Sequence, residues 1–315
     1  MKKRYWIGIP VSALAAMVAA KLFWRPKDVE WEENREAVFH ADYSRFIEVD
    51  GIRLHYLEAG ISNGPPMILL HGFASSNLVW SKVFLEFAAL GFRVIAPDLP
   101  GYGYSAKPTH LDYTIAGQAE TVIGFMKRLE IDRAFLVGSS YGAAVAATIA
   151  LEQPALVEKL VLVGAVNNNK PTRYLLMRLF GAPIIGDILS PLLVGSRLLL
   201  RRRMKRVYNK HAWTLDERRV QARHLPLRTR GAHRAIIRTV RRWDADRVSR
   251  EAHLIKPPTL LLWGDTDREV PLADGERLHE SIAGSRLIVF RDCGHLPQEE
   301  YPHAFAQIVS GFCSA

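Results

Sequence analysis

Short apolar segments that end in turn residues recur along this sequence and restrict its fold more than any other feature. Six of them are "PPMILLHGF", "FRVIAPDLPG", "AFLVGSS", "EKLVLVGAV", "PTLLLWGDTD" and "SRLIVFRDCGH", with helix-like segments between them. Strands that are apolar on both faces are typical of a parallel sheet covered by helices. Ahead of them, "RFIEVDGIRLHYLEAG" alternates on both sides of Asp50-Gly51, which predicts a hairpin. The chain is therefore expected to form a mostly parallel, eight-stranded α/β sheet.

The alternation stops over roughly 85 residues, between about 167 and 254. This region contains "YLLMRLFGAPIIGDILSPLLVGSRLLL", which charged residues and prolines interrupt, so it predicts short amphipathic helices and not a membrane span. We interpret residues 167–254 as a helical cap inserted between two strands. The core of the domain is then formed by residues 45–166 and 255–315.

The positive charge of the protein is concentrated in the cap. The net charge is +10, and between Arg197 and Arg250 there are 16 arginines and 2 lysines against 4 acidic residues. Such a region is either a solvated helical surface or one that attracts anionic lipid or substrate. No nucleic-acid-binding motif accompanies the charge, so a nucleic acid partner is not expected. The two cysteines do not form a disulfide framework, and free thiols are expected.

The first 24 residues form a separate segment. Three basic residues precede an apolar stretch from Tyr5 to Trp24 that is continuous if Lys21 snorkels. About 20 helical residues span roughly 30 Å, the thickness of a bilayer core, and aromatic residues stand at both ends. We expect residues 1–24 to be a single-pass anchor, residues 25–44 a linker, and the catalytic part extracytoplasmic. Cleavage as a secretory signal after Ala20 is the alternative.

The stretch "AFLVGSSYGAAVA" contains the candidate nucleophile. It places Ser140 between Gly138 and Gly142, where a strand gives way to a small-residue helix. The glycines are needed because side chains there would collide, and the tight turn projects the serine hydroxyl over the helix N-terminus. Ser139 lacks flanking glycines at both positions and is a neighbour.

A serine hydroxyl becomes a nucleophile when a base takes its proton and a carboxylate holds that base. "WGDTDREVP" places two acids after one strand, and "DCGHLPQEE" places His295 after the last strand. Together with "HGF", "DLPGYGYS" and "GSSYG", these motifs resemble the α/β-hydrolase superfamily, whose triad runs nucleophile, acid, histidine along the chain. The resemblance covers about residues 45–165 and 255–315.

This resemblance implies a role for each residue. Asp267 is the acid that orients His295, His295 is the base for Ser140, and the backbone N–H groups of Phe73 and Tyr141 form the oxyanion hole. Asp265 is the alternative acid. His71 and Asp98 are expected to be structural, Asp292 to be a surface residue, and Cys293 to be a small buried thiol. The position after "LVLVGAV" holds Asn167, Asn168 and Asn169 and no carboxylate, so an acid from that strand is not expected.

Serine at the turn selects among the reactions of the superfamily. Relatives that open epoxides or remove halide use aspartate there, whereas Ser140 suits hydrolysis of a carboxylic ester through an acyl-enzyme, without a metal or organic cofactor. The apolar cap and the N-terminal segment favour lipophilic esters such as acylglycerols, and resemble the membrane-anchored monoacylglycerol lipase-like branch. The alternatives are a carbon–carbon bond hydrolase of ring-cleavage products, a perhydrolase or haloperoxidase side activity, and a low-turnover ligand-binding protein. The oligomeric state stays open.

Overall fold

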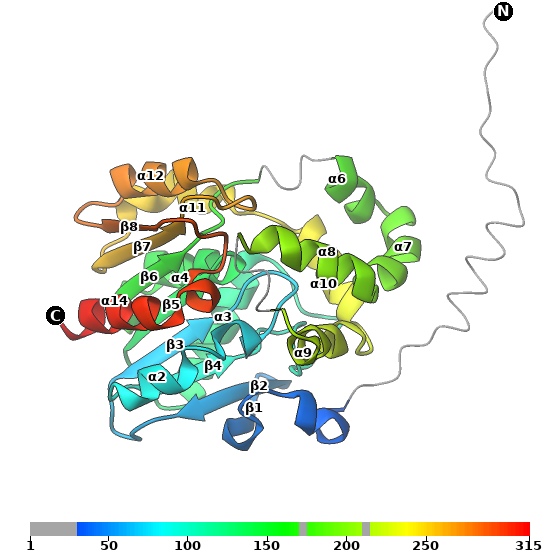
Figure 1. Cartoon of the computed structure of the whole chain (residues 1–315), viewed down its shortest axis with the longest axis horizontal. Coiled ribbons are helices and arrows are strands. Elements are labelled where there is room, and N and C mark those ends of the chain that lie inside the picture. Colours follow the sequence, from blue (N-terminus) through cyan, green and yellow to red (C-terminus); the bar gives the residue numbers. More distant parts are fainter. Residues whose placement is uncertain (1–29, 170–174, 210–214) are drawn as a thin grey trace, which may run out of the picture.

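One eight-stranded sheet organises the molecule. The computed structural model describes residues 30–169, 175–209 and 215–315 (Figure 1). The strands are β1 (Ser44–Val49), β2 (Ile52–Ala59), β3 (Pro66–Leu70), β4 (Arg93–Pro97), β5 (Ala134–Ser139), β6 (Val157–Val163), β7 (Thr259–Gly264) and β8 (Arg286–Phe290). Their order in the sheet is β1-β2-β4-β3-β5-β6-β7-β8. The β1–β2 and β2–β4 pairs are antiparallel and the remaining pairs are parallel, which confirms the predicted sheet.

The hairpin between β1 and β2 turns at the dipeptide that predicted it. Asp50 and Gly51 both have positive φ, at 48° and 78°, as a two-residue type I′ turn requires. Val49 therefore pairs with Ile52, and this hairpin adds the antiparallel edge of the sheet.

Side chains of successive strand residues enter two separate cores, one on each face of the sheet. In β3, for example, Ile68 and Leu70 belong to one core, and Met67 and Leu69 belong to the other. The first core includes residues of α3 (Ile115–Arg128), α4 (Tyr141–Glu152), α11 (Asp246–Glu251) and α12 (Leu272–Ser281); the second includes residues of η3 (Asn77–Trp80), α2 (Phe84–Ala89) and α14 (Pro302–Ser314). Burial on both faces explains why these strands are apolar throughout.

A group of helices lies between β6 and β7 in the chain, at one end of the sheet (Figure 1). They are α6 (Leu175–Gly181), α7 (Ile185–Val194), α8 (Arg197–Val207), α9 (Glu217–Leu227) and α10 (Ala232–Arg241). The hydroxyl of Ser196 caps α8 and the carboxylate of Asp216 caps α9. We call α6 to α10 the cap helices.

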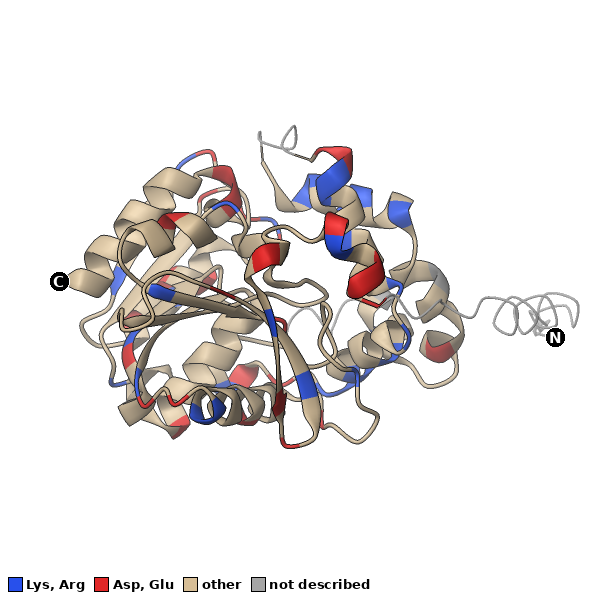
Figure 2. Cartoon of the chain, turned by 90° about the horizontal axis from the view of Figure 1, so that it is seen from below, with Lys and Arg blue, Asp and Glu red and all other residues tan. Residues whose placement is uncertain are grey.

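Acidic residues neutralise part of the basic charge of the cap helices, and Figure 2 shows both kinds of residue on them. Arg197 and Arg201 pair with Glu217, and Arg241 pairs with Asp187. These pairs are exposed or only partly buried, so each contributes little stability.

The residues before β1 pack against the core and α9. Residues 30–44 are the described part of the predicted linker; they include two 3₁₀ helices, η1 (Glu32–Ala37) and η2 (Ala41–Tyr43), and end with the first residue of β1. The ring of Trp31 packs edge-on against Phe46 of β1, and Val38 is buried. The predicted anchor, residues 1–24, lies outside the described residues. Across the described ranges, no helix combines the length and apolar character needed to cross a bilayer.

Candidate active site

Ser140 stands between β5 and α4 in a strained conformation. Its φ is 56° and its ψ is −115°, a region that residues with a side chain rarely adopt. The surrounding chain holds it there, because the N–H group of Ser140 donates to the carbonyl of Val163 at 2.8 Å, and its carbonyl accepts from Val166 at 3.2 Å. The sharp turn places Ser140 at the N-terminus of α4, as the sequence predicts.

The two glycines that flank Ser140 are required by close backbone contacts. A Cβ atom on Gly138 would lie 2.4 Å from the carbonyl oxygen of Gly142. A Cβ atom on Gly142 would lie 2.3 Å from the carbonyl oxygen of Leu70 and 2.5 Å from that of His71. Any larger residue would push α4 away from β3 and β5, so the glycines keep the serine directly beyond the carboxyl end of β5.

His295 and Asp267 form a buried hydrogen-bonded pair. Nδ1 of His295 donates to Oδ2 of Asp267 at 2.6 Å, and the other oxygen, Oδ1, accepts the backbone N–H groups of Glu269 and Val270 at 2.8 and 3.0 Å. Because Nδ1 carries the proton, Nε2 of the neutral ring is left as the basic nitrogen. The structure thus brings together the two residues that the sequence assigned as base and acid.

The electrostatic surroundings of His295 favour its protonated form. Burial is the largest single influence and lowers the pKa, but the charge and hydrogen bond of Asp267, with a contribution from Glu269, outweigh it. The pKa of His295 is therefore raised above 6.5. A histidine in this state can accept a proton and stabilise it as imidazolium.

The loops that carry Ser140 and His295 meet beyond the ends of β5 and β6. Gly164 follows Val163, the residue whose carbonyl accepts the N–H of Ser140. A Cβ atom on Gly164 would lie 3.0 Å from the ring of His295 and 3.3 Å from Asp267. On the other side, the side chain of Gln298 donates to the hydroxyl of Ser139 at 3.2 Å. The Gln298–Ser139 hydrogen bond therefore joins the serine turn to the histidine loop, and the loop after β6 packs closely against the ring of His295.

Two backbone N–H groups beside Ser140 are available to an oxyanion. A Cβ atom on Gly72 would lie 3.1 Å from the Cβ of Ser140, so the loop after β3 passes directly next to the serine, and Phe73 follows. Tyr141 is the first residue of α4, where N–H groups lack partners within the helix. Within the described part of the chain, neither the Phe73 nor the Tyr141 N–H donates to a protein acceptor. Both amides fit the predicted oxyanion hole.

Aromatic side chains line the region around these amides. The ring of Trp243, just after α10, lies 5.5 Å from the rings of both Phe73 and Tyr141. Tyr102 contacts Phe73 and Tyr141 as well, and its hydroxyl shares a hydrogen bond with Thr239 of α10 at 2.7 Å. Neither Trp243 nor Tyr102 was expected at the site from the sequence. Tyr102 belongs to the motif "DLPGYGYS", but no pattern in the sequence connects this motif with α10.

One arginine of the cap lies close to this group. The guanidinium carbon of Arg203, on α8, is 5.8 Å from the centre of the Phe73 ring, and its charge acts to lower the pKa values of His295 and Tyr102. Its side chain is exposed. The sequence indicated a basic cap without singling out Arg203, because the charge run gives no sign of which arginine faces the serine.

His71 and Asp98, which are expected to be structural, both hold loops through hydrogen bonds. Nε2 of His71 accepts the N–H of Leu99 at 2.9 Å, and burial lowers the pKa of His71. Asp98 accepts from His55 and from the N–H groups of Asn77 and Tyr104.

The residues next to the proposed acid and base also have structural contacts. Asp265 accepts the N–H of Cys293 at 3.2 Å, and the carboxylate that contacts His295 belongs to Asp267. Cys293 and Cys313 are buried free thiols, and burial raises the pKa of both. Across the described residues, no cluster of three or more potential metal ligands occurs.

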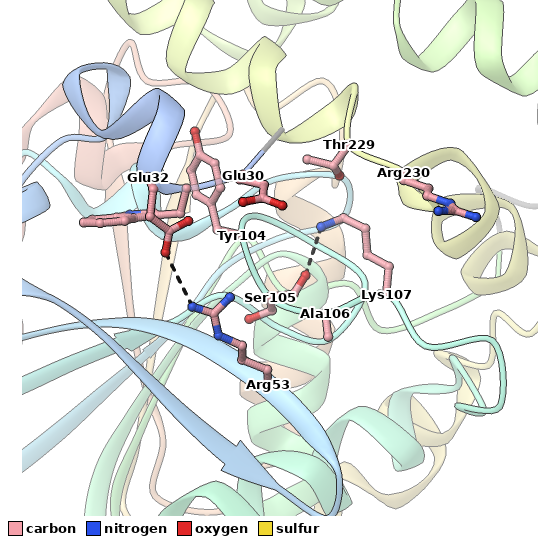
Figure 3. Close-up of a pocket in the computed structure, with 10 residues that line it drawn as sticks. Glu30, Glu32, Arg53, Tyr104, Ser105, Ala106, Lys107, Thr229 and Arg230 are labelled. Carbon is pink, nitrogen blue, oxygen red and sulfur yellow. Dashed lines mark hydrogen bonds and ion pairs between the residues drawn. The ribbon is translucent and has the colours of Figure 1, made fainter. Parts of the chain in front are cut away.

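A polar pocket of about 360 Å³ lies elsewhere, where the segment before β1 meets the loop after β4 and the turn between α9 and α10 (Figure 3). Charged side chains on its wall include Glu32, Arg53 and Lys107, and Figure 3 shows Arg53 directed at Glu32. Ser140 and His295 are absent from its lining, so this pocket is separate from the candidate active site.

The family of the chain follows from comparison with known proteins. Residues 65–302 match the family model described as the alpha/beta hydrolase fold. The match covers most of the chain and both segments that carry the site, so the protein belongs to the alpha/beta hydrolase fold family.

Individual relatives have different activities. The chain is 30% identical over 282 residues to 2-hydroxymuconate semialdehyde hydrolase of Pseudomonas sp. (strain CF600), an alignment that covers 86% of this chain and 94% of the relative. The crystal structure of a serine hydrolase involved in carbazole degradation, the CarC enzyme, is 25% identical with a TM-score of 0.72, covering 86% of this chain and 98% of that one. A membrane phospholipase A shares the fold at 24% identity with a TM-score of 0.72, covering 96% of both chains.

Proposed function

We propose that the protein is a serine hydrolase that cleaves lipophilic carboxylic esters, such as acylglycerols, through an acyl-enzyme on Ser140. His295 takes the proton from the serine hydroxyl as its oxygen attacks the ester carbonyl, and Asp267 supports the charge on the ring. The N–H groups of Phe73 and Tyr141 stabilise the oxyanion, and His295 then protonates the leaving alkoxide. A water molecule activated by His295 releases the acid and restores Ser140.

The observation that carries this proposal is the group of aromatic side chains beside the N–H groups of Phe73 and Tyr141, neither of which has a protein acceptor within the described residues. Phe73 and Tyr141 supply these amides, and their own rings pack against Trp243. The Tyr141 ring is fully buried, whereas Phe73 and Trp243 are partly exposed. A substrate carbonyl bound at the amides would place its attached groups beside Phe73 and Trp243, where apolar groups gain from leaving water. An ester with an acyl or aryl part suits this surface.

Carbon–carbon bond hydrolysis of ring-cleavage products is the second candidate. The relative of 30% identity is named for 2-hydroxymuconate semialdehyde, an anionic compound, and Arg203 near Phe73 offers a positive charge to such a substrate. The same serine, base and oxyanion groups would serve both reactions, so the catalytic residues alone do not choose between them.

Direct assay with two substrate classes tests the proposal. We expect p-nitrophenyl butyrate and octanoate to be turned over with a higher kcat/KM than 2-hydroxymuconate semialdehyde, and Ser140→Ala to lose turnover of both esters. Preference for the semialdehyde would favour the second candidate. Peroxide and acetate added to the assay would reveal a perhydrolase side activity.

A fluorophosphonate probe separates enzymes from binding proteins, because it labels only an activated serine. Labelling of wild type but not of Ser140→Ala would support hydrolysis. Folded wild-type protein that neither reacts with the probe nor turns over any ester would instead favour a low-turnover ligand-binding protein.

We further propose that the protein works at a membrane surface, with residues 1–24 as an anchor and the catalytic part extracytoplasmic. Exposed apolar side chains of the cap include Leu179 on α6, Leu198 on α8 and Ile184 in the turn before α7. Helices α6 and α8 also carry exposed arginines, among them Arg178 and Arg197. This combination suits the interface of an anionic bilayer. The full chain should float with phosphatidylglycerol vesicles more completely than with phosphatidylcholine vesicles; recovery only in the soluble fraction would reject the proposal.

A further inference from the structure

The chain segment that leaves cap helix α8 is bonded directly to the loop that carries His295. The backbone N–H of His295 donates to the carbonyl of Val207, the last residue of α8, at 2.9 Å. Leu296, the next residue, is buried in a small apolar cluster with Met204 and Tyr208, also from this part of the cap. The backbone that positions the imidazole therefore rests on the cap and not on the sheet alone.

Glu300 joins the same two segments through its carboxylate. Oε1 accepts the backbone N–H of Gly294 at 2.7 Å, and Oε2 accepts that of Asn209 at 3.1 Å. Gly294 immediately precedes His295, and Asn209 lies two residues beyond the end of α8. A carboxylate suits this position because both of its oxygens are acceptors.

Glu299, the neighbouring residue on the short helix α13 (Pro297–Glu300), binds the cap from the other side. It is fully buried, accepts the hydroxyl of Tyr208 at 2.5 Å, and pairs with Arg219 and Arg223 of α9. Arg219 also donates to Ser81 of the core at 3.0 Å. Two adjacent carboxylates thus hold α9 and the segment after α8 against the histidine loop.

The contact between the histidine loop and the cap is tight enough to exclude a side chain. A Cβ atom on Gly294 would lie 2.4 Å from the carbonyl oxygen of Val207 and 2.9 Å from the N of Asn209. Glycine is therefore required by the approach of the cap to residue 294.

We propose that Glu300 is a positioning residue, which acts through the segment Val207–Asn209 and the N–H of Gly294 to hold His295 in its catalytic orientation. In this arrangement the end of α8 and the segment after it support the backbone of the base. The proposal rests on the function proposed above, in which His295 is the general base.

Glu300→Gln is the sharpest test, because glutamine keeps the size of the side chain and loses one acceptor. One of the two backbone N–H groups must then face an NH₂ group, and the link between Gly294 and Asn209 breaks. Glu276→Gln, an exposed glutamate on α12, is the matched control. We expect kcat for p-nitrophenyl butyrate to fall about 10- to 100-fold in Glu300→Gln with KM little changed, since misplacement of a catalytic group affects chemistry more than binding.

Two further readouts do not depend on the ester being a substrate. The first is the downfield proton NMR signal of the Nδ1–H of His295, assigned by its absence in His295→Ala, which should shift or broaden in Glu300→Gln. The second is the rate of serine labelling by a fluorophosphonate, which should fall with kcat. If wild type neither hydrolyses an ester nor reacts with the fluorophosphonate, the proposed function fails, and the NMR signal of His295 still decides the role of Glu300.

Gly294→Ala makes the same test from the other side of the contact and serves if Glu300→Gln fails to fold. Its control is Gly311→Ala on α14, where an added Cβ meets no atom within 4 Å. We expect Gly294→Ala to alter the His295 signal and to slow labelling, and Gly311→Ala to change neither. A folded Glu300→Gln or Gly294→Ala protein with an unaltered signal and labelling at the wild-type rate would overturn the proposal.

Discussion

His295 donates a hydrogen bond to Asp267 across 2.6 Å, and the second oxygen of this carboxylate is held by two backbone amides. Both oxygens are therefore engaged, which fixes the direction of the carboxylate and, through it, the orientation and tautomer of the imidazole. The pair links the loop after β7 to the loop after β8, two segments that the chain brings together only after the cap has been completed.

Asp267→Asn should reduce kcat by about 10³- to 10⁴-fold, because the asparagine amide disfavours the tautomer that leaves Nε2 free. The acid limb of the pH profile should also move. In wild type the raised pKa of His295 places the midpoint of this limb above pH 6.5, and without the carboxylate it should fall. Measurement of kcat/KM for p-nitrophenyl butyrate across pH gives both quantities. Equal midpoints in the two proteins would contradict this account of the pair.

Arg203→Met should move the acid limb of the pH profile of kcat/KM to higher pH, opposite to the shift expected for Asp267→Asn. The charge of Arg203 lowers the pKa of His295, so its removal should raise that pKa and move the midpoint to higher pH. The KM for p-nitrophenyl butyrate should change little, whereas the KM for the carboxylate-bearing ester mono-p-nitrophenyl glutarate should rise. Arg202→Met, the neighbouring exposed position on α8, is the control and should leave the midpoint in place. A midpoint that does not move in Arg203→Met would show that this side chain is too solvated to influence the base.

Gly142→Ala should destabilise the protein by about 3 kcal/mol or more, because its Cβ would overlap two backbone carbonyls that cannot turn aside. Gly311→Ala, also in a helix but with open space around it, should instead stabilise by roughly 0.5–1 kcal/mol through helix propensity. Urea unfolding followed by circular dichroism measures both values. Similar stabilities for the two variants would mean that α4 can move away from β3.

Glu299→Gln should cost about 3–5 kcal/mol at neutral pH, because it leaves Arg219 and Arg223 buried without their counter-charge. Glu217→Gln, which also removes a partner of two arginines but at an exposed site, should cost at most about 1 kcal/mol. Chemical unfolding of both variants at neutral pH provides the comparison. Equal losses would indicate that the arginines of α9 are solvated in solution.

The same glutamate should make stability fall in acid. Burial acts to raise the pKa of Glu299, but the two arginines and the Tyr208 hydroxyl outweigh it and hold the pKa below 4.5. A depressed pKa contributes stability that is complete above the unfolded value and is lost as pH falls through the folded value. The difference between wild type and Glu299→Gln should therefore narrow below about pH 4.5. A difference in unfolding free energy that stays constant down to pH 3 would show that the pKa of Glu299 does not change between the folded and unfolded states.

The sheet and the serine turn could be predicted because each depends on neighbours in the sequence. Apolar residues on both faces define buried strands, and Gly138 and Gly142 define the turn around Ser140. The surroundings of Glu299 could not be predicted in this way. Arg219 and Arg223 look like other members of a charged run, and their burial depends on a carboxylate about 80 residues further along the chain. The ring contacts of Trp243 could not be predicted either, because its partners Phe73 and Tyr141 lie more than 100 residues away in the sequence.

The order of the strands has a consequence for the newly made chain. Ser140 follows β5, whereas His295 is contributed by the loop after β8, beyond the whole cap. A ribosome-bound chain therefore carries Ser140 well before His295 has been synthesised. In the proposed mechanism, the serine hydroxyl lacks its base until the chain beyond β8 has been made and has joined the sheet.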